Sequence, residues 1–498
     1  MKSASRIGMF IAAALAAALC AAPLAAQERN GAPAMGGTVH RTLSNGLEVF
    51  VVENHAVPLA TVCVAFRGGA IAQTPETAGL FHLYEHMLFT GNERYRNQAA
   101  FNAAINRMGV SSWNGGTGME YINYYVTVPS DRLGDGIEFW SWAVKTPVFT
   151  QEKLDNEKNV VINEIQGDHN DPDEIFDNAV GSRVYTAFPW RKNVDGPEDN
   201  VRKATLDQLQ DIRRQFYIPG NAALFIGGDV SPEAAFALAE KCFGDWTGGP
   251  APKVAEQPQA AFPAGVRLVY PDDDFYDGIA QIELRWRGPD SLAQAKDTYT
   301  SDVFLFLLSS PAGKFKQDIM SKCPGLYDEK YIDFSYPTTR DGGTYFFTAY
   351  ALLADSANLG GTLDRAVAVE KTVRDEFALI ARDPAAYFGA DELAKAKAKL
   401  IDRNLLSTEV ASSFVTGTLT FWWAVASADY FFGYEDNCDK VTFDDIKDLI
   451  GRYLLSGNDS LAVRLKTGDY QGEQGMADRQ KALGFTEVGA ANAFWWQK

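Results

Sequence analysis

The sequence repeats one short order of elements, and this repeat constrains the fold more than any other feature. The segment Phe101–Ile105 is followed by a glycine and then by the apolar strand pattern Tyr121–Val128. A second copy runs from Phe315–Ile319 through Gly325 to the strand pattern Thr344–Tyr350. The second helical segment and the second strand segment follow their first copies at similar distances along the chain, which indicates an old duplication. We therefore predict two related domains.

A stretch rich in Pro, Ala, Gly and Gln separates the two copies. Residues 248–263 have no hydrophobic periodicity and are predicted to form a linker. The domains on either side are then residues 27–247 and residues 264–498. Both alternate apolar strand patterns with amphipathic helix patterns, which favours mixed α/β domains.

Hydrophobic periodicity predicts the elements of the first domain in more detail. The expected strands are Glu48–Val52, Ala60–Phe66 and Tyr121–Val128, and the expected helices are Ala78–Thr90, Gln98–Met108, Asp131–Lys145 and Gln151–Gly167. A strand and a helix are also expected around Gly227-Gly228, with Ser231 as N-cap and Pro232 at the first helical position. A phosphate-binding loop is the alternative there, but Asp229 would repel an anion.

The first 26 residues have the organisation of a secretory signal peptide. Lys2 and Arg6 precede the apolar run Met9–Leu19, and small residues follow up to Ala26. We predict cleavage near Ala26 and an exported, periplasmic protein. Lipidation at Cys20 or a membrane anchor is the alternative. However, the apolar run is short, and no later run reaches the ~18–20 residues of a membrane span.

The charge of the chain argues against a nucleic-acid role. The net charge is −18 at pH 7, and removal of Lys2 and Arg6 with the signal peptide would make it −20. Such a surface repels phosphate backbones. The remaining cysteines are far apart and form no C-x-x-C pair, so neither a cysteine zinc site nor a redox dithiol is expected. Cys63 is predicted to be a buried strand residue, and a disulfide is left open.

The motif that carries chemistry is His82-Leu-Tyr-Glu85-His86. On a helix, residues i and i+4 share a face, so the two imidazoles can reach one metal ion. Glu85 lies on the same flank, near a water at that ion. The flanking residues are apolar, which predicts a buried helix, and unpartnered polar groups would be costly there. Mutual pairing of these side chains is the alternative, but H-x-x-E-H is the inverted zinc-peptidase motif.

A catalytic zinc site needs a third protein ligand. His40, His55 and His169 are candidates, and so are Glu157 and Glu164 on a single predicted helix. The two glutamates are two helical turns apart and therefore face the same way. A solvated acidic stripe is the alternative for this pair, and spacing alone does not decide between the two interpretations.

These segments resemble the pitrilysin/insulinase family of inverted-motif zinc metallopeptidases. Glu157 to Glu164 fits the family pattern E-x-x-V-V-x-x-E, and Gly79 and the segment Asn114–Tyr125 also match. The resemblance implies one Zn²⁺ per chain, with Glu164 as the third ligand beside the two histidines and Glu157 orienting a histidine. It is specific over residues 38–247 and looser beyond.

The resemblance also implies the fold class and the reaction. The expected fold is α+β, with two homologous mixed α/β domains of the processing-peptidase (LuxS-like metallohydrolase) type forming one half of a clamshell. The expected activity is a zinc-dependent endopeptidase with Glu85 as general base. In the family an edge strand pairs with the substrate backbone. The matching residues are Asn114, Gly115, Gly116 and Thr117, so short unfolded peptides are the expected substrates, whereas an idle glycine-rich turn is the alternative.

One family feature is incomplete. In the resembling family an Arg and a Tyr, seven residues apart, bind the oxyanion from the opposite half of the clamshell. Tyr327 matches the Tyr, but Met320 stands in place of the Arg, and Lys322 is the nearest cation. Tyr327 alone would be a weak oxyanion donor. The resemblance therefore predicts a heterodimer in which a related chain supplies the Arg/Tyr pair.

Two other classes of function compete with this prediction. A non-catalytic structural or peptide-binding subunit of the same fold is the main alternative, but relatives of that kind usually have a damaged motif, and this motif is intact. A periplasmic peptide-binding protein would have no reason to keep Glu85.

Overall fold

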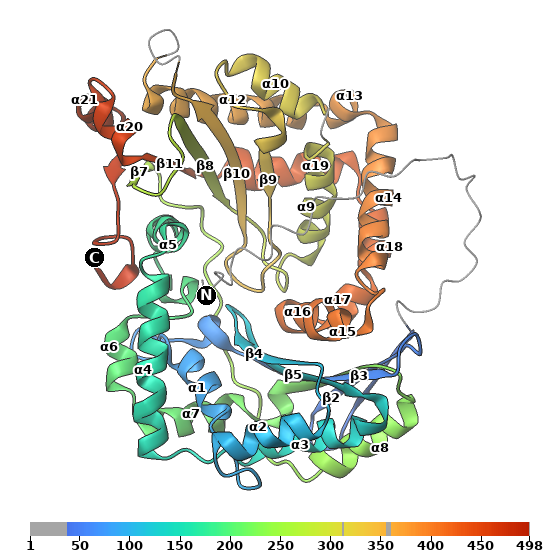
Figure 1. The fold of residues 1–498 in the computed structure, drawn as a ribbon. Coiled ribbons are helices and arrows are strands. Elements are labelled where there is room, and N and C mark those ends of the chain that lie inside the picture. Colours follow the sequence, from blue (N-terminus) through green and yellow to red (C-terminus); the bar gives the residue numbers. More distant parts are fainter. Residues whose placement is uncertain (1–36, 311–312, 355–359, 498) are drawn as a thin grey trace. The chain divides into compact units, whose positions relative to one another are not determined.

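The chain folds into two mixed α/β halves, each built on a six-stranded sheet (Figure 1). This computed structural model describes residues 37–310, 313–354 and 360–497. The predicted signal peptide lies outside the described residues. The predicted linker, residues 248–263, contains no helix or strand. Throughout the described ranges, each helix is either too short or too polar to reach across a lipid bilayer.

The sheet of the first half has the strand order β1-β2-β6-β3-β5-β4. Only β2 and β6 run parallel, and the other neighbours are antiparallel. The strands are β1 (Thr38–Thr42), β2 (Glu48–Glu53), β3 (Leu59–Arg67), β4 (Ser112–Thr117), β5 (Tyr121–Pro129) and β6 (Ala222–Gly228). The helices are α1 (Leu80–Leu88), α2 (Gln98–Arg107), α3 (Leu133–Lys145), α4 (Gln151–Asp168), α5 (Pro172–Val184), α6 (Glu198–Lys203), α7 (Leu206–Phe216) and α8 (Pro232–Phe243).

The sheet of the second half has the order β12-β7-β11-β8-β10-β9. Its strands are β7 (Val266–Asp272), β8 (Ile279–Arg287), β9 (Asp333–Ser335), β10 (Thr344–Leu352), β11 (Asp459–Lys466) and β12 (Thr486–Glu487). The longer helices are α9 (Ala295–Leu308), α10 (Lys314–Lys322), α12 (Thr362–Arg382) and α14 (Ala390–Leu406). The shorter helices are α13 (Pro384–Phe388), α15 (Ala411–Ser413), α16 (Leu419–Val425), α17 (Ala428–Phe432), α18 (Tyr434–Asp439), α19 (Phe443–Leu449), α20 (Thr467–Gly472) and α21 (Met476–Leu483).

The predicted repeat is confirmed by the order and direction of the strands. In each sheet a parallel pair, β2–β6 or β7–β11, is followed by two antiparallel strands and a short edge strand. The repeated segments identified in the sequence are α2 with β5 in one half and α10 with β10 in the other. Because α9 occupies the position of α1 and has no histidine, the histidine motif belongs to one half only.

The predicted elements of the first half are also confirmed, with ends that differ by at most two residues. The α1 helix is shorter than expected because it begins after Gly79, whose φ is 90°. The α8 helix begins as predicted, with Pro232 in its first turn and the Ser231 hydroxyl accepting a hydrogen bond from the Ala234 N–H. Cys63 is fully buried in β3, as expected. Among the described residues all four cysteines are free.

Each half covers a sheet face of the other half. One face of the first sheet packs against its own helices, among them α1, α3 and α7. The opposite face, which includes Phe50 and Phe225, is covered by Phe414, Leu419 and Trp423 from the second half. Conversely, α5 of the first half packs with β7 and β11 of the second sheet. Burial of apolar surface is the main stabilising term in folding, so the two halves depend on each other.

Polar contacts add to this packing. The Trp423 indole N–H donates to the Glu48 carboxylate at 2.8 Å. Arg285 in β8 forms an ion pair with Asp177 in α5 at 2.7 Å. Within the first half, α1 contacts α4 and the edge strand β4. The predicted site residues meet where these three elements come together.

Candidate metal centre and edge strand

The α1 helix is buried, as its apolar flanks predicted. Leu80, Leu83, Tyr84, Met87 and Leu88 have no exposed surface and belong to the core of the first half. The two histidines share the remaining face, with ring centroids 4.9 Å apart. Dense packing of its apolar residues holds α1 in place, and its polar side chains are therefore held in fixed positions relative to the surrounding elements.

Gly79 allows a distant loop to lie against the start of α1. A side chain here would place a Cβ atom 2.2 Å from the backbone oxygen of Asp195. The Gly79 N–H donates to the Gln73 side chain at 2.6 Å, and the amide of Gln73 donates to the Asn193 carbonyl at 2.9 Å. These contacts bring Asp195 to His82, because the chain can pass at this distance only where no Cβ is present.

The α4 helix brings both glutamates of the predicted pattern to the histidines. Glu164 Oε2 lies 3.5 Å from His82 Nε2 and 3.2 Å from His86 Nε2. One ligand atom from each of these three residues can be chosen so that all lie within 4.8 Å of one another. Leu154, Val161 and Ile165 bury the flank of α4 next to the glutamates, and this packing fixes the direction in which Glu164 points.

The second nitrogen of each imidazole faces another carboxylate. His86 Nδ1 lies 3.5 Å from Glu157 Oε2. His82 Nδ1 lies 3.2 Å from Asp195 Oδ1, although this contact is not aligned as a hydrogen bond. Carboxylates in these positions orient metal-binding histidines and raise their basicity. Asp195 was not found from the sequence, because it follows α1 at a long distance in a loop with no recognisable spacing.

The electrostatics of the cluster favour a positive charge. Burial lowers the histidine pKa values, but contacts with Asp195, Glu157 and Glu164 outweigh burial and raise the pKa of His82 to about 10 and that of His86 to about 9. The same histidines hold the pKa of Glu164 well below its usual range. Several carboxylates thus surround two imidazoles. A zinc ion, bound by two imidazole nitrogens and one carboxylate oxygen, fits this donor set and would replace the protons.

Glu85 lies beside the ligand cluster and is fixed by the edge strand. Its side chain is nearly buried, with 7% of the residue exposed. The Thr117 hydroxyl, at the end of β4, donates to Glu85 Oε2 at 2.9 Å. Thr117 was predicted only as part of the substrate edge, and this hydrogen bond gives it a second connection to the site. The contact holds one carboxylate oxygen and leaves the other for a proton-transfer partner.

The other predicted edge residues lie along β4, which among the described strands pairs only with β5 and is therefore an open edge of the sheet. Asn114 is exposed, whereas Gly115 is buried. A Cβ at Gly115 would lie 2.6 Å from the Phe89 ring, so this position must lack a side chain. A Cβ at Gly116 would come no closer than 3.8 Å to Asn123.

The remaining candidates lie elsewhere. His40 pairs with Glu48 and His55 with Asp229, while the His169 ring packs against Phe494 and Trp496. In the second half Tyr327 is half exposed, and its N–H donates to the Tyr350 carbonyl at 2.8 Å. Met320 packs against the core of that half, and Lys322 is paired with the buried carboxylate of Glu376.

Two related α/β halves, with an H-x-x-E-H helix facing a glutamate in one of them, are features of inverted-motif metallohydrolases. Comparison with known families gives the same class. Residues 48–198 match the family model described as insulinase (peptidase family M16), and residues 203–400 match the model described as peptidase M16 inactive domain. The chain belongs to the insulinase family, peptidase family M16.

Individual relatives are distant. A probable mitochondrial-processing peptidase subunit beta of Arabidopsis thaliana is 26% identical over 51% of this chain and 48% of its own length. An uncharacterised zinc protease of Bacillus subtilis is 25% identical over 41% of this chain and 49% of its own length. The chain thus spans about half the length of these curated relatives. Among solved structures, the first half of an Escherichia coli periplasmic protease has a TM-score of 0.69 at 16% identity, covering 91% of this chain and 97% of that one.

We expect zinc binding to follow the ligand geometry. His82→Ala and Glu164→Ala should lose zinc, because two remaining ligands hold the ion poorly. Asp195→Asn should keep the ligands but bind zinc about 10–100-fold more weakly, since the support of one histidine is lost. Metal content and zinc affinity of the purified variants measure this.

His55→Ala is the matched control, because His55 lies in the same half but pairs with Asp229 away from the cluster. It should bind zinc like the unchanged chain. Stoichiometric zinc in His82→Ala would overturn the ligand assignment.

Proposed function

We propose that the chain is a zinc-dependent endopeptidase, in which His82, His86 and Glu164 hold the metal. The observation that carries this proposal is the convergence of their three ligand atoms beside Glu85. A structural zinc site would be closed by a fourth protein ligand, whereas a catalytic site keeps one position open. Within the described residues the ligand cluster has three members.

The residues of the chain have separate roles in peptide hydrolysis. Zinc, when bound, supplies a Lewis acid that polarises the substrate carbonyl and acidifies water. Glu85 accepts the proton of the attacking water and passes it to the departing amine. Thr117 holds Glu85 through one oxygen. Glu157 and Asp195 keep the two imidazoles turned toward the metal.

We propose extended peptides as the substrates, bound along β4. The Gly118 N–H donates to the Tyr121 carbonyl. By the alternation of an antiparallel pair, Gly116 and Asn114 also use their backbone groups toward β5. The backbone groups of Gly115 and Thr117 then point to the open side, where a peptide strand can pair with them. Thr117 also contacts Glu85, so the added strand would pass the general base. A stably folded protein offers no free strand for this pairing.

We further propose that the chain is the catalytic subunit of a two-chain enzyme. The oxyanion formed during hydrolysis needs donors besides the metal. Met320 provides none, and Lys322 is held by Glu376. A related chain with an Arg/Tyr pair, closing over the site, would supply them. The predicted signal peptide supports export to the periplasm as the place of action.

A non-catalytic subunit that binds peptides or serves as a structural partner is the second candidate. The match of residues 203–400 to the inactive-domain model concerns a region that lies mostly in the metal-free half, and it is compatible with either function. The two candidates differ at Glu85, because peptide binding alone does not require a general base beside the metal.

Changing Glu85 separates these candidates. Glu85→Gln should retain zinc and the fold but lose about 10²–10⁴-fold in kcat, because an amide cannot accept the proton. Peptide hydrolysis by the assembled enzyme and zinc content are the measurements. Glu93→Gln, an equal change of charge at an exposed position, should leave both unchanged. Hydrolysis at the original rate by Glu85→Gln would assign the base to another group.

The edge strand can be tested at a single glycine. Gly116→Pro should raise KM strongly, because proline removes an N–H from the β4–β5 pairing and distorts the edge. Gly116→Ala should behave like the unchanged chain, since its Cβ meets nothing closer than 3.8 Å. The assay uses a short unstructured peptide and, in parallel, a stable folded protein as a negative substrate. Rapid digestion of the folded protein while the peptide survives would contradict the proposed substrate class.

The partner can be tested by mixing. We expect the purified chain alone to hydrolyse peptides about 10²–10³-fold more slowly than its mixture with an M16 half-chain that carries the Arg/Tyr pair. The same partner with that Arg changed to Ala should fail to activate. A homodimer cannot repair the defect, because each copy has Met320. Full activity of the lone chain, unchanged on mixing, would show that no partner is needed.

A further inference from the structure

A loop of the metal-free half contacts the turn in which the edge strand ends. We call residues Thr339–Gly343 the clasp loop. Glu120, in the turn between β4 and β5, is 6% exposed, and its carboxylate points at this loop. Its two oxygens accept the backbone N–H groups of Arg340 at 2.8 Å and Asp341 at 3.2 Å. Such charge-assisted hydrogen bonds in a buried place are strong and directional.

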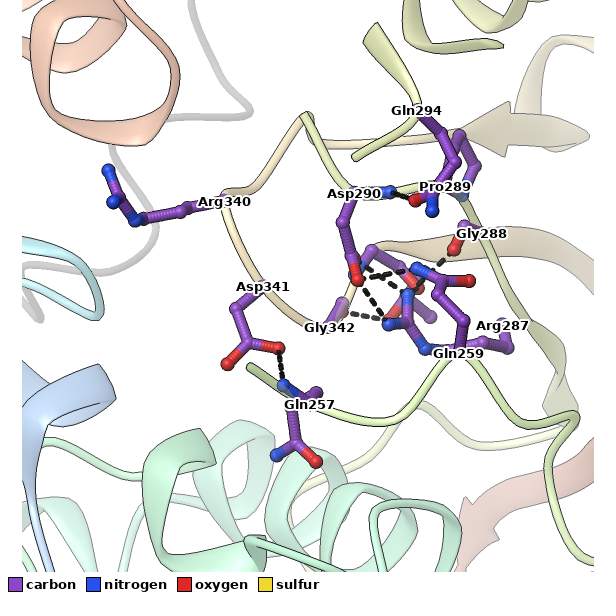
Figure 2. A network of polar contacts seen from close by, with 12 residues as sticks. Gln257, Gln259, Arg287, Gly288, Pro289, Asp290, Gln294, Arg340, Asp341 and Gly342 are labelled. Carbon is purple, nitrogen blue, oxygen red and sulfur yellow. Dashed lines mark hydrogen bonds and ion pairs between the residues drawn. The ribbon is translucent and has the colours of Figure 1, made fainter. Parts of the chain in front are cut away.

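The clasp loop is held firmly by its own half. The Gly343 N–H donates to the Asp290 carboxylate at 2.8 Å, and Arg287 donates to the same carboxylate. The Ser291 N–H donates to the Thr339 carbonyl at 2.9 Å. Figure 2 shows Asp290 between Arg287 and the clasp loop. The loop therefore presents its N–H groups to Glu120 from a fixed position.

The linker and the first half hold the same loop from another direction. The Asp341 carboxylate accepts a hydrogen bond from the Gln257 N–H at 2.8 Å, as Figure 2 shows. It also forms an ion pair with Arg191 at 3.0 Å. Lys192 donates to the carbonyls of Asp341 and Gly342, both at 3.2 Å. Because buried polar groups that satisfy one another form a rigid network, the loop has little freedom to move away from Glu120.

The turn held by Glu120 is directly connected to the general base. Thr117, which donates to Glu85, is the last residue of β4, and the turn begins at the next residue. On its other side the turn is bound within the first half, since Ile71 donates to the Met119 carbonyl at 2.7 Å. The clasp loop of the second half thus holds this turn through the Glu120 carboxylate.

We propose that Glu120 is a positioning residue through which the clasp loop of the metal-free half fixes the β4 edge and the Thr117–Glu85 hydrogen bond. Substrate pairing and general-base orientation then depend on a half that contributes none of the three proposed metal ligands. This inference rests on the proposed function for its effect on peptides. The structural part, the ordering of β4 by Glu120, is independent of that function.

The test compares two variants that each lose one contact between the halves. Glu120→Ala removes the contact to the clasp loop. Asp177→Ala removes the ion pair between α5 and Arg285, on the covered face of the second sheet. If Glu120 merely joins the halves, the two variants should behave alike. Burial raises the pKa of Glu120 to about 7, so the measurements are made near pH 8.5, where the carboxylate form predominates.

Hydrogen–deuterium exchange of the zinc-free chain gives the first measurement. Glu120→Ala should speed exchange in residues 112–127 by about 10-fold or more, since the end of the edge strand loses its support. Asp177→Ala should leave these residues protected. Glu120→Gln, whose amide oxygen can still accept one N–H, should fall between Glu120→Ala and the unchanged chain. Unchanged protection of residues 112–127 in Glu120→Ala would overturn the proposal.

Peptide hydrolysis by the assembled enzyme gives the second measurement. Glu120→Ala should lower kcat/KM about 10–100-fold at unchanged zinc content, the scale expected for a small misplacement of reacting groups. Asp177→Ala should keep kcat/KM. Equal losses in the two variants would overturn the positioning role. If the unchanged enzyme hydrolyses no peptide under any condition, the proposed function fails, and the exchange result still decides whether Glu120 orders the edge.

Discussion

The site depends on the placement of several carboxylates around two partly buried imidazoles. Glu85, Glu157, Glu164 and Asp195 come from three separate segments, and their negative charges would repel one another without a cation. The same excess of negative charge raises the pKa values of His82 and His86. This interaction explains why α1 is so apolar, since only dense packing can hold the charged side chains in one place. It also explains the glycine at its start, where the Asp195 loop passes.

The second feature that organises the fold is that each half covers one sheet face of the other half. Each half has an open sheet face that its own helices leave uncovered. The α16 region closes the first face, and α5 closes the second. The second half is therefore part of the framework on which the site is built. The clasp loop extends this support to the edge strand itself, where the backbone of a peptide would lie.

Much of the fold and site could be predicted because the signals are local. The α1 helix has an apolar pattern and two histidines at helical spacing, so local periodicity was sufficient there. For the glutamates of α4, spacing left a solvated stripe open, and the family resemblance selected Glu164 as the predicted ligand. Asp195 and Glu120 could not be predicted in this way. Each acts through a contact between segments far apart in the chain, and neither has neighbours that mark it. The hydrogen bond from Thr117 to Glu85 was missed for a related reason. A sequence pattern can indicate an edge strand, but it does not show which helix packs against that strand.

The reciprocal cover of the two sheets has a consequence for the connection between the halves. A chain cut within residues 248–263 would leave two pieces, each with an apolar sheet face that the other piece fits. Separation would expose both faces to water at once, and the hydrophobic cost would oppose it. The pieces should therefore remain together as a noncovalent complex, much as two subunits do. Viewed in this way, the single chain is a tethered dimer of two diverged copies, and its peptide linker raises the local concentration of each copy around the other.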